Sequence, residues 1–172
     1  HRELKDYNIK ALAEAGRRVW NETLGRIKVE GGTEDDKTVF YSSFYRTFER
    51  PICMSEDGRY FSAFDGKVHE DNGTPFYNDD WIWDTYRAAH PLRTLIDRQK
   101  EEDIIASYLR MAEQMGNMWM PTFPEVTGDT RRMNSNHAVA TIADALAKGL
   151  KVDTVKAYEA CRKGMEEKTL AP

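Results

Sequence analysis

The sequence predicts a mainly α-helical fold in which helix pairs alternate with long loops, as in part of an α/α toroid. Apolar residues recur at helical spacing in six segments of the chain, and most of these segments begin or end at a capping or helix-breaking residue. The intervening segments contain many Gly, Pro, Asp and aromatic residues and keep no steady period. Because no fixed repeat or linker divides the chain, we expect one structural unit.

The first two helices are predicted in the N-terminal 50 residues. Residues 3–23 carry apolar residues at helical spacing, and Gly25 is placed to end this helix. Residues 27–29 form a possible short strand or an extended link. Thr33 precedes three acidic residues, as an N-cap does, and the second helix must end before Pro51. Its expected buried stripe is Val39, Phe40, Phe44 and Phe48.

The middle of the chain is expected to hold hairpins or a long ordered loop, followed by a third helix. Residues 54–78 are rich in Gly, Asp and aromatic residues, and loops of this length tend to be functional. The third helix is predicted to begin near Asp79 or Asp80 and to run to Ala89. Pro91 should kink or end it, because proline lacks an amide donor.

Three further helices are predicted in the C-terminal half. Asp97 is placed to cap the fourth helix, Gly116 or Asn117 to close it, and Asp153 to cap the sixth, with a loop at 118–134. The inward stripe of the fourth helix is Ile104, Ile105, Tyr108, Leu109, Ala112 and Met115. The stripes of the fifth and sixth helices are Val139, Ile142, Leu146 and Leu150, and Val155, Tyr158, Cys161 and Met165.

Composition excludes several classes of function. Hydrophobic residues make up 40% of the 172 residues, which is enough for a compact globular domain. A net charge of −4 without a long basic run gives no signature of binding to nucleic acid or to an anionic membrane. No segment approaches the ~20 apolar residues of a membrane-spanning helix. Cys53 and Cys161 permit one disulfide but no thiolate metal site, and His1 without a leader segment suggests a piece of a longer protein.

The segment 78–91 carries the most informative chemistry. It places two indoles, four carboxylates or amides, an arginine and a histidine beside one another. Indoles stack on the C–H faces of a sugar ring, while carboxylates and guanidinium groups bind its hydroxyls in fixed directions. The same residues also fit a structural role, with the indoles in a core and Asp79 or Asp80 as a helix cap.

The order of residues in this segment resembles a known family. Residues 83–92, which read Trp-Asp-Thr-Tyr-Arg-Ala-Ala-His-Pro-Leu, resemble the Leu-Trp-Asp-Thr-Phe-Arg-Ala-x-His-Pro-Leu signature of glycoside hydrolase family 92, the calcium-dependent exo-acting α-mannosidases. Further similar segments follow the family's order at 40–45, 57–60, 65–69 and 133–149. The resemblance covers most of residues 20 to 165.

This resemblance implies a fold and an activity. Residues 1–172 would form the N-terminal part of an (α/α)6 catalytic domain, without the β-sandwich that precedes it in the family and without the remaining helices. The full-length enzyme would hydrolyse terminal α-linked mannose with inversion, with α-1,2 linkages as the first expectation. Its partners would be mannose-terminated glycans, as in N-glycan degradation, its cofactor calcium, and its location periplasmic or secreted.

The residues that perform catalysis in the family have no counterpart here. The family places its acid in Leu-Glu-Tyr-x-x-Asp-Asp, its base in Asn-Asp-Asp-x-Gly and part of its calcium centre in Glu-Gly-Asn-x-x-Gln, and none of these patterns occurs in this chain. We therefore assign no catalytic residue and no metal ligand, and expect the chain alone to be inactive, with calcium held by segments outside it. The aspartates at 57, 65, 71, 79 and 80 also lack calcium-loop spacing.

Five residues are candidates for binding the sugar. Trp83 and Asp84 match family positions in the subsite for the terminal mannose, where the indole would stack and the carboxylate would accept hydrogen bonds from hydroxyls. Arg87 would either contact the ligand or orient Asp84 through an ion pair three residues away. His69 and His137 would contact the ligand, although a surface turn for His69 and ordinary packing for His137 fit almost as well.

Other residues near these candidates carry structural expectations. His90 is expected to donate to a backbone carbonyl freed at a helix kink. Ser135 or Asn136 is expected to cap the fifth helix. The sequence departs from the family at Asp129, Arg132 and Ser135, where Glu, a small residue and Gly are usual, so the geometry of this loop and the linkage preference stay open.

Two other functions fit the sequence. A noncatalytic helical module that binds glycans or proteins would also lack catalytic carboxylates. Another α/α-toroid glycosidase acting on a different sugar would differ in its requirement for calcium.

Overall fold

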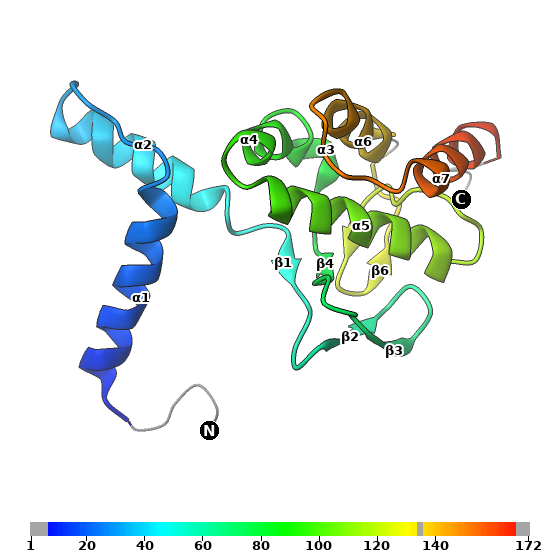
Figure 1. Ribbon diagram of the computed structural model, residues 1–172, viewed down its shortest axis with the longest axis horizontal. Coiled ribbons are helices and arrows are strands. Elements are labelled where there is room, and N and C mark those ends of the chain that lie inside the picture. Colours follow the sequence, from blue (N-terminus) through cyan, green and yellow to red (C-terminus); the bar gives the residue numbers. More distant parts are fainter. Residues whose placement is uncertain (1–6, 134–135, 168–172) are drawn as a thin grey trace. The chain divides into compact units, whose positions relative to one another are not determined.

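The computed structural model describes residues 7–133 and 136–167 (Figure 1). These residues form seven α-helices and three two-stranded antiparallel sheets of short strands, which confirms the mainly α-helical prediction. The chain divides into two compact units, residues 1–48 and 49–172, where we expected one. None of the helices in the described part combines the length and the apolar composition that crossing a membrane requires.

The first unit contains two helices, α1 (Ile9–Leu24) and α2 (Glu34–Arg46). The Asn8 side chain caps α1 by accepting from the amide of Ala11, and Gly25 follows its end as predicted. Thr33 caps α2 in a capping box with Asp36. Residues 27–29 form no strand and belong to an irregular link that starts with a bend at Ile27, and the Tyr41 hydroxyl donates to the carbonyl of Ile27 at 3.0 Å.

Aromatic residues hold the first unit together. Phe40, Phe44 and Phe48 recur every four residues and form one stripe, with Phe44 buried. Trp20 of α1 packs on Tyr45, with 4.5 Å between the ring centroids. Val39, predicted in the buried stripe, is 66% exposed. That prediction was wrong because a residue one position before Phe40 points about 100° away from the stripe.

The loops of the second unit contain short paired strands. In residues 54–78 these include a hairpin, as the sequence predicted. β2 (Arg59–Ser62) and β3 (Lys67–Glu70) pair as a hairpin, with Arg59 opposite Glu70. β1 (Ile52–Cys53) pairs with β4 (Tyr77–Asn78), and β5 (Pro124–Glu125) with β6 (Gly128–Asp129). Tyr60 and Phe76 stack at 4.1 Å and fix the hairpin to the core.

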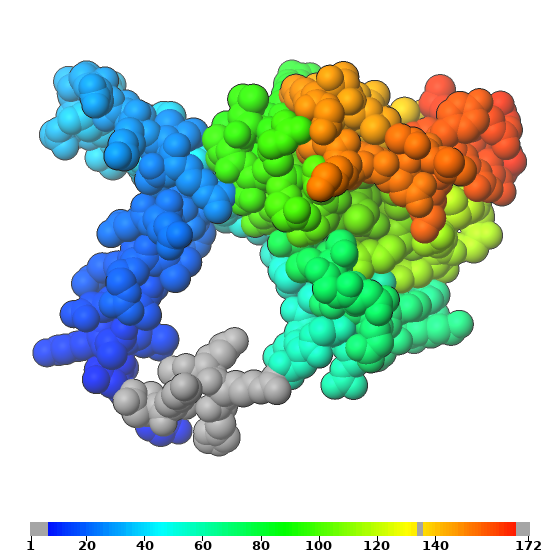
Figure 2. Space-filling model, in the orientation of Figure 1, coloured from blue at the N-terminus to red at the C-terminus, as the bar shows by residue number. Residues whose placement is uncertain are grey.

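Five helices complete the second unit. They are α3 (Ile82–Thr85), α4 (Ala89–Ile96), α5 (Arg98–Gln114), α6 (His137–Ala147) and α7 (Thr154–Glu166). α5 contacts α4, α7 and strand β4, so its apolar stripe lies at the centre of the core (Figure 1). The space-filling view shows the green to red atoms of α4 to α7 closely packed (Figure 2). The predicted stripe of α5 is buried, with Met115 half-buried.

Two helix predictions need correction. The third predicted helix is two helices, because residues 86–88 form a turn and Pro91 lies inside the first turn of α4. The first-turn amides of a helix need no acceptor within it, so proline is tolerated there. In α7, Ala157, Ala160 and Gly164 are buried. The predicted stripe residues Val155, Tyr158 and Met165 are exposed instead.

The helix caps agree with the sequence only in part. Asp153 caps α7 by accepting from the amide of Lys156. Asp97 occupies the N-cap position of α5, and its backbone carbonyl accepts from the amide of Glu101 at 3.1 Å, but its side chain does not cap the helix. Asn136 precedes α6, also without a side-chain cap. Ser135 lies outside the described residues.

Candidate functional site

The structure brings four of the five predicted binding residues together. A pocket of about 270 Å³ is lined by Trp83, Asp84, Tyr86, Arg87 and His137. The first four come from α3 and the turn that follows it, and His137 is the first residue of α6. α3 and α6 pack against each other, which explains how residues more than 45 positions apart meet.

The pocket has one aromatic wall and several polar groups. The Trp83 indole is 47% exposed, so a face is free to receive a ligand. The imidazole of His137 packs on the Tyr86 ring at 4.0 Å between centroids and meets Trp83 edge-on at 6.5 Å. The Asp84 carboxylate and the Arg87 guanidinium are exposed beside these rings. Apolar faces next to charged hydrogen-bonding groups suit a polar ligand with a C–H face.

Arg87 does not orient Asp84 in the way that the sequence suggested. In the described part of the chain the two residues form no ion pair, and the Arg87 guanidinium lies 5.9 Å from the centroid of the Tyr86 ring. Its interaction with Tyr86 raises the pKa of Arg87. The prediction assumed helical spacing between residues 84 and 87, but α3 ends at Thr85. Arg87 therefore faces the pocket from the turn.

The surroundings of His137 disfavour its charged form. Burial lowers its pKa, and the positive charge of Arg87 lowers it further. Its Nδ1 atom is inaccessible to solvent and has no hydrogen-bond partner among the described residues. A neutral imidazole has one donor and one acceptor nitrogen. His137 can therefore donate a hydrogen bond to a ligand or accept one from it.

His69, the fifth predicted residue, does not line this pocket. It belongs to β3, where its Nε2 lies 2.9 Å from Asp65 Oδ2 and its ring stacks on Tyr60 at 5.4 Å. Both contacts are local to the β2–β3 hairpin.

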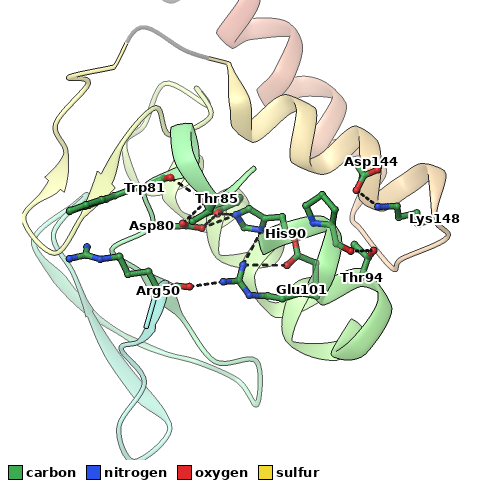
Figure 3. Close-up of polar contacts among 12 residues, drawn as sticks. Arg50, Asp80, Trp81, Thr85, His90, Thr94, Glu101, Asp144 and Lys148 are labelled. Carbon is green, nitrogen blue, oxygen red and sulfur yellow. Dashed lines mark hydrogen bonds and ion pairs between the residues drawn. The ribbon is translucent and has the colours of Figure 1, made fainter. Parts of the chain in front are cut away.

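A buried polar network lies behind α3. His90 is fully buried, with Nδ1 2.8 Å from Glu101 Oε1 and Nε2 2.9 Å from Asp80 Oδ2 (Figure 3). Tyr108 also donates to Asp80, and Arg93 lies 3.9 Å from Glu101 and donates to the carbonyl of Arg50 at 2.5 Å. The prediction that His90 donates to a carbonyl was wrong, because Pro91 does not break a helix there.

The charges of this network balance. Two carboxylates, Asp80 and Glu101, face two cations, His90 and Arg93. Burial alone would lower the pKa of His90, but Asp80 and Glu101 raise it to about 9. Burial opposes ionisation of Asp80, yet His90 and Tyr108 bring its pKa down to about 2. Burial and the charge of Asp80 raise the pKa of Tyr108 well above its usual value, so Tyr108 stays a donor.

Sequence reasoning missed Glu101. The inward stripe predicted for this helix began at Ile104 and did not include Glu101, but Glu101 is fully buried. A signal was present, because positions 101, 104, 105, 108 and 112 follow one helical stripe and the first is a glutamate. A charged residue in an apolar stripe indicates a buried partner.

The residues present do not fit a calcium site. Within the described residues no group of three or more His, Cys, Asp or Glu side chains is placed to hold a metal ion. Asp65 pairs with His69, Asp79 pairs with Arg50 at 2.5 Å, and Asp80 belongs to the buried network. Asp129, where the family has Glu, accepts from the amides of Thr122 and Phe123 and so holds the β5–β6 loop.

Comparison with known proteins places this chain in a family. The sequence profile of the Glycosyl hydrolase family 92 catalytic domain matches residues 1–172. A solved family 92 inverting mannosidase from Bacteroides thetaiotaomicron is 36% identical, with a TM-score of 0.81 over 92% of this chain and 22% of its own. A family 92 α-mannosidase from the same organism, in complex with mannoimidazole, is 28% identical, with a TM-score of 0.88 over 96% and 22%.

A further solved family 92 glycosyl hydrolase is 26% identical, with a TM-score of 0.73 over 96% of this chain and 22% of its own. None of the curated proteins compared matches the chain. The chain thus spans about 22% of the length of the solved proteins that it matches. The match of the family profile along all 172 residues shows that the chain belongs to glycosyl hydrolase family 92 and is part of its catalytic domain.

Proposed function

We propose that the full-length protein is an exo-α-mannosidase that hydrolyses terminal α-linked mannose with inversion, and that this chain forms part of its mannose pocket. One observation carries the proposal: in this family 92 chain a single pocket is lined by Trp83, Asp84, Tyr86, Arg87 and His137. The similarity to an inverting mannosidase, at 36% identity, supports the stereochemistry. For the linkage preference we propose α-1,2, which is the first linkage to test.

The pocket residues have distinct roles in this proposal. Trp83 stacks on the C–H face of the terminal mannose, and Asp84 accepts hydrogen bonds from its hydroxyls. Arg87 and the neutral His137 supply donors to the remaining oxygens. These groups bind and orient the ring, so binding energy is used to hold the substrate in a reactive geometry.

Acid, base and calcium come from outside this chain in the proposed enzyme. Inverting hydrolysis needs a carboxylic acid and a carboxylate ~6.5 to 9.5 Å apart. No carboxylate of this chain is assigned to either role, and the described residues do not form a calcium site. The helices of this chain would belong to an (α/α)6 toroid, the protein would be periplasmic or secreted, and the isolated chain would be inactive.

The test follows mannose release by the full-length protein from α-linked mannobioses. Proton NMR identifies the first-formed anomer, with added calcium and then with excess chelator. We expect β-mannose first, and loss of release with chelator. An α-anomer would contradict inversion, and no release from any linkage would contradict the mannosidase proposal in favour of another sugar or a noncatalytic module.

Two matched variants connect this activity to the pocket. Asp84→Asn keeps the shape of the side chain but removes its charge, so kcat/KM should fall by about tenfold to a hundredfold. Asp144→Asn makes the same change in a surface ion pair with Lys148 on α6 and should stay within about twofold. If kcat/KM fell equally in the two variants, the proposal that this pocket binds mannose would be contradicted.

A further inference from the structure

Of the residues that line the pocket, Tyr86 packs against the hydrophobic core, and three others are exposed. α3 is only four residues long, and an isolated helix of that length is not stable in water. Trp83, Asp84 and Arg87 are exposed, so the core does not fix them. Ile82 is the one residue of α3 that is buried. Beside the packing of Ile82 and Tyr86, polar contacts hold the segment that carries the pocket.

Asp80 connects the two ends of that segment. It lies two residues before the start of α3, and its Oδ1 accepts from the hydroxyl of Thr85, the last residue of α3, at 2.7 Å. Its other oxygen accepts from His90, at the start of α4, and from Tyr108 of α5. Its backbone amide donates to the carbonyl of Pro124 at 3.1 Å.

His90 fixes the far end of the segment. Each of its ring nitrogens lies within 2.9 Å of a carboxyl oxygen, and a doubly protonated imidazole donates to both when the two carboxyl groups are ionised. The ring therefore ties α4 to Asp80 on one side and to Glu101 of α5 on the other. Residues 80 and 90 are the boundaries of the segment that contains four of the five pocket residues.

We propose that Asp80, Thr85 and His90 are positioning residues that hold α3 and its following turn so that Trp83 and Asp84 face the sugar. This inference rests on the proposed mannosidase function. The three residues do not line the pocket; they act through the segment between them. The Asp80–Thr85 hydrogen bond is the direct link from the buried network to α3 (Figure 3).

Thr85 offers a variant that changes this link and spares the buried charges. Thr85→Val removes the hydroxyl with little change of shape, while Asp80, His90 and Glu101 keep their mutual contacts. Thr85→Ser restores a hydroxyl and should recover the wild-type behaviour. Thr94→Val is the matched control, because the Thr94 hydroxyl donates to the carbonyl of Pro91 within α4, at 2.7 Å.

Two measurements on the full-length protein test the proposal. Hydrogen exchange of the amides of residues 82–88 should be faster in Thr85→Val and unchanged in Thr94→Val. For α-mannobiose, KM should rise by about tenfold in Thr85→Val, as expected for a hydrogen bond to a charged group, with a smaller change of kcat. Thr85→Ser should return both quantities close to wild type.

The outcomes separate this proposal from the mannosidase assignment. Unchanged exchange and unchanged KM in Thr85→Val would overturn the positioning role even if the wild type is an active mannosidase. Equal effects of Thr85→Val and Thr94→Val would also overturn it, because they would indicate a general loss of stability. If the wild type releases no mannose, the mannosidase proposal fails, and the exchange rates alone decide whether Thr85 positions α3.

Discussion

At the scale of single residues, His90 and His137 show how surroundings set the charge of the same side chain. Both belong to the second unit, and burial alone disfavours the imidazolium of each. Asp80 and Glu101 lie on the two ring nitrogens of His90 and raise its pKa, whereas burial and the nearby positive charge of Arg87 lower the pKa of His137. One ring therefore serves the scaffold, and the other is available to a ligand.

The protonation of His90 makes stability depend on pH. Its folded-state pKa of about 9 exceeds the ordinary 6.5, so its contribution is complete below pH 6.5 and is lost as the pH rises through 9. Asp80, with a pKa of about 2 against the ordinary 3.8, contributes fully above pH 3.8 and loses its contribution as the pH falls through 2. Stability from this pair should be greatest between about pH 4 and 6.5.

Urea unfolding of the chain at pH 6 and pH 9 measures this effect. We expect the free energy of unfolding to fall between these values by about 1 kcal/mol per pH unit at the steepest point. In His90→Gln that fall should disappear, and the variant should be less stable by about 3 to 5 kcal/mol at pH 6, because two buried carboxylates lose a partner. His69→Gln changes the partly exposed pair of His69 with Asp65 and should leave the fall of the unfolding free energy between pH 6 and pH 9 as in the wild type. If His69→Gln also abolished this pH dependence, the assignment of the pH dependence to His90 would be contradicted.

At the scale of elements, the sequence predicted helices well and the faces of some helices badly. The capping box at Thr33, the cap at Asp153 and the stripe of α5 follow from local rules, because each depends on residues within one or two turns. The break at residues 86–88 does not, since it depends on packing of α3 and α4 against other helices. Pro91 was correctly seen as a helix signal but assigned to the wrong end.

The candidate site shows the same division. The motif pointed to Trp83 and Asp84 as binding residues, Arg87 and His137 were further candidates, and the structure places all four around one pocket. The absence of the Arg87–Asp84 pair in the described residues and the burial of Glu101 could not be read from spacing alone. Both depend on where α3 ends and on which long-range partners α5 meets, which are properties of the packed chain.

The corrected face of α7 gives a prediction at this scale. The sequence placed Tyr158 in the buried stripe, but it is 71% exposed, while Ala160 is fully buried. Tyr158→Ala should therefore change the stability of the 172-residue chain by no more than about 0.5 kcal/mol. Ala160→Leu should cost about 1 to 3 kcal/mol, because the larger side chain must be forced into a packed interior. Thermal unfolding of both variants checks this, and the reverse order of stabilities would restore the sequence-based face.

At the scale of the whole molecule, the two compact units differ in how much core each has. In the first unit, α1 has no buried residue and α2 buries only Phe44. In the second unit, sixteen buried residues form one cluster around α5. Protection of backbone amides follows local burial, so the units should open with different free energies.

Hydrogen exchange of the chain, with one variant in each unit, tests this independence. Phe44→Ala removes the buried ring of the first unit and should speed exchange in α1 and α2 without changing α5. Ile105→Ala, at a site 1% exposed, should cost about 2 to 5 kcal/mol in the second unit and speed exchange in α5 without changing α2. Acceleration in both units by either variant would mean that the chain opens as a single cooperative body. Separate responses would mean that the pocket at α3 depends on the core of the second unit, because the described residues that line or support it lie between 50 and 137.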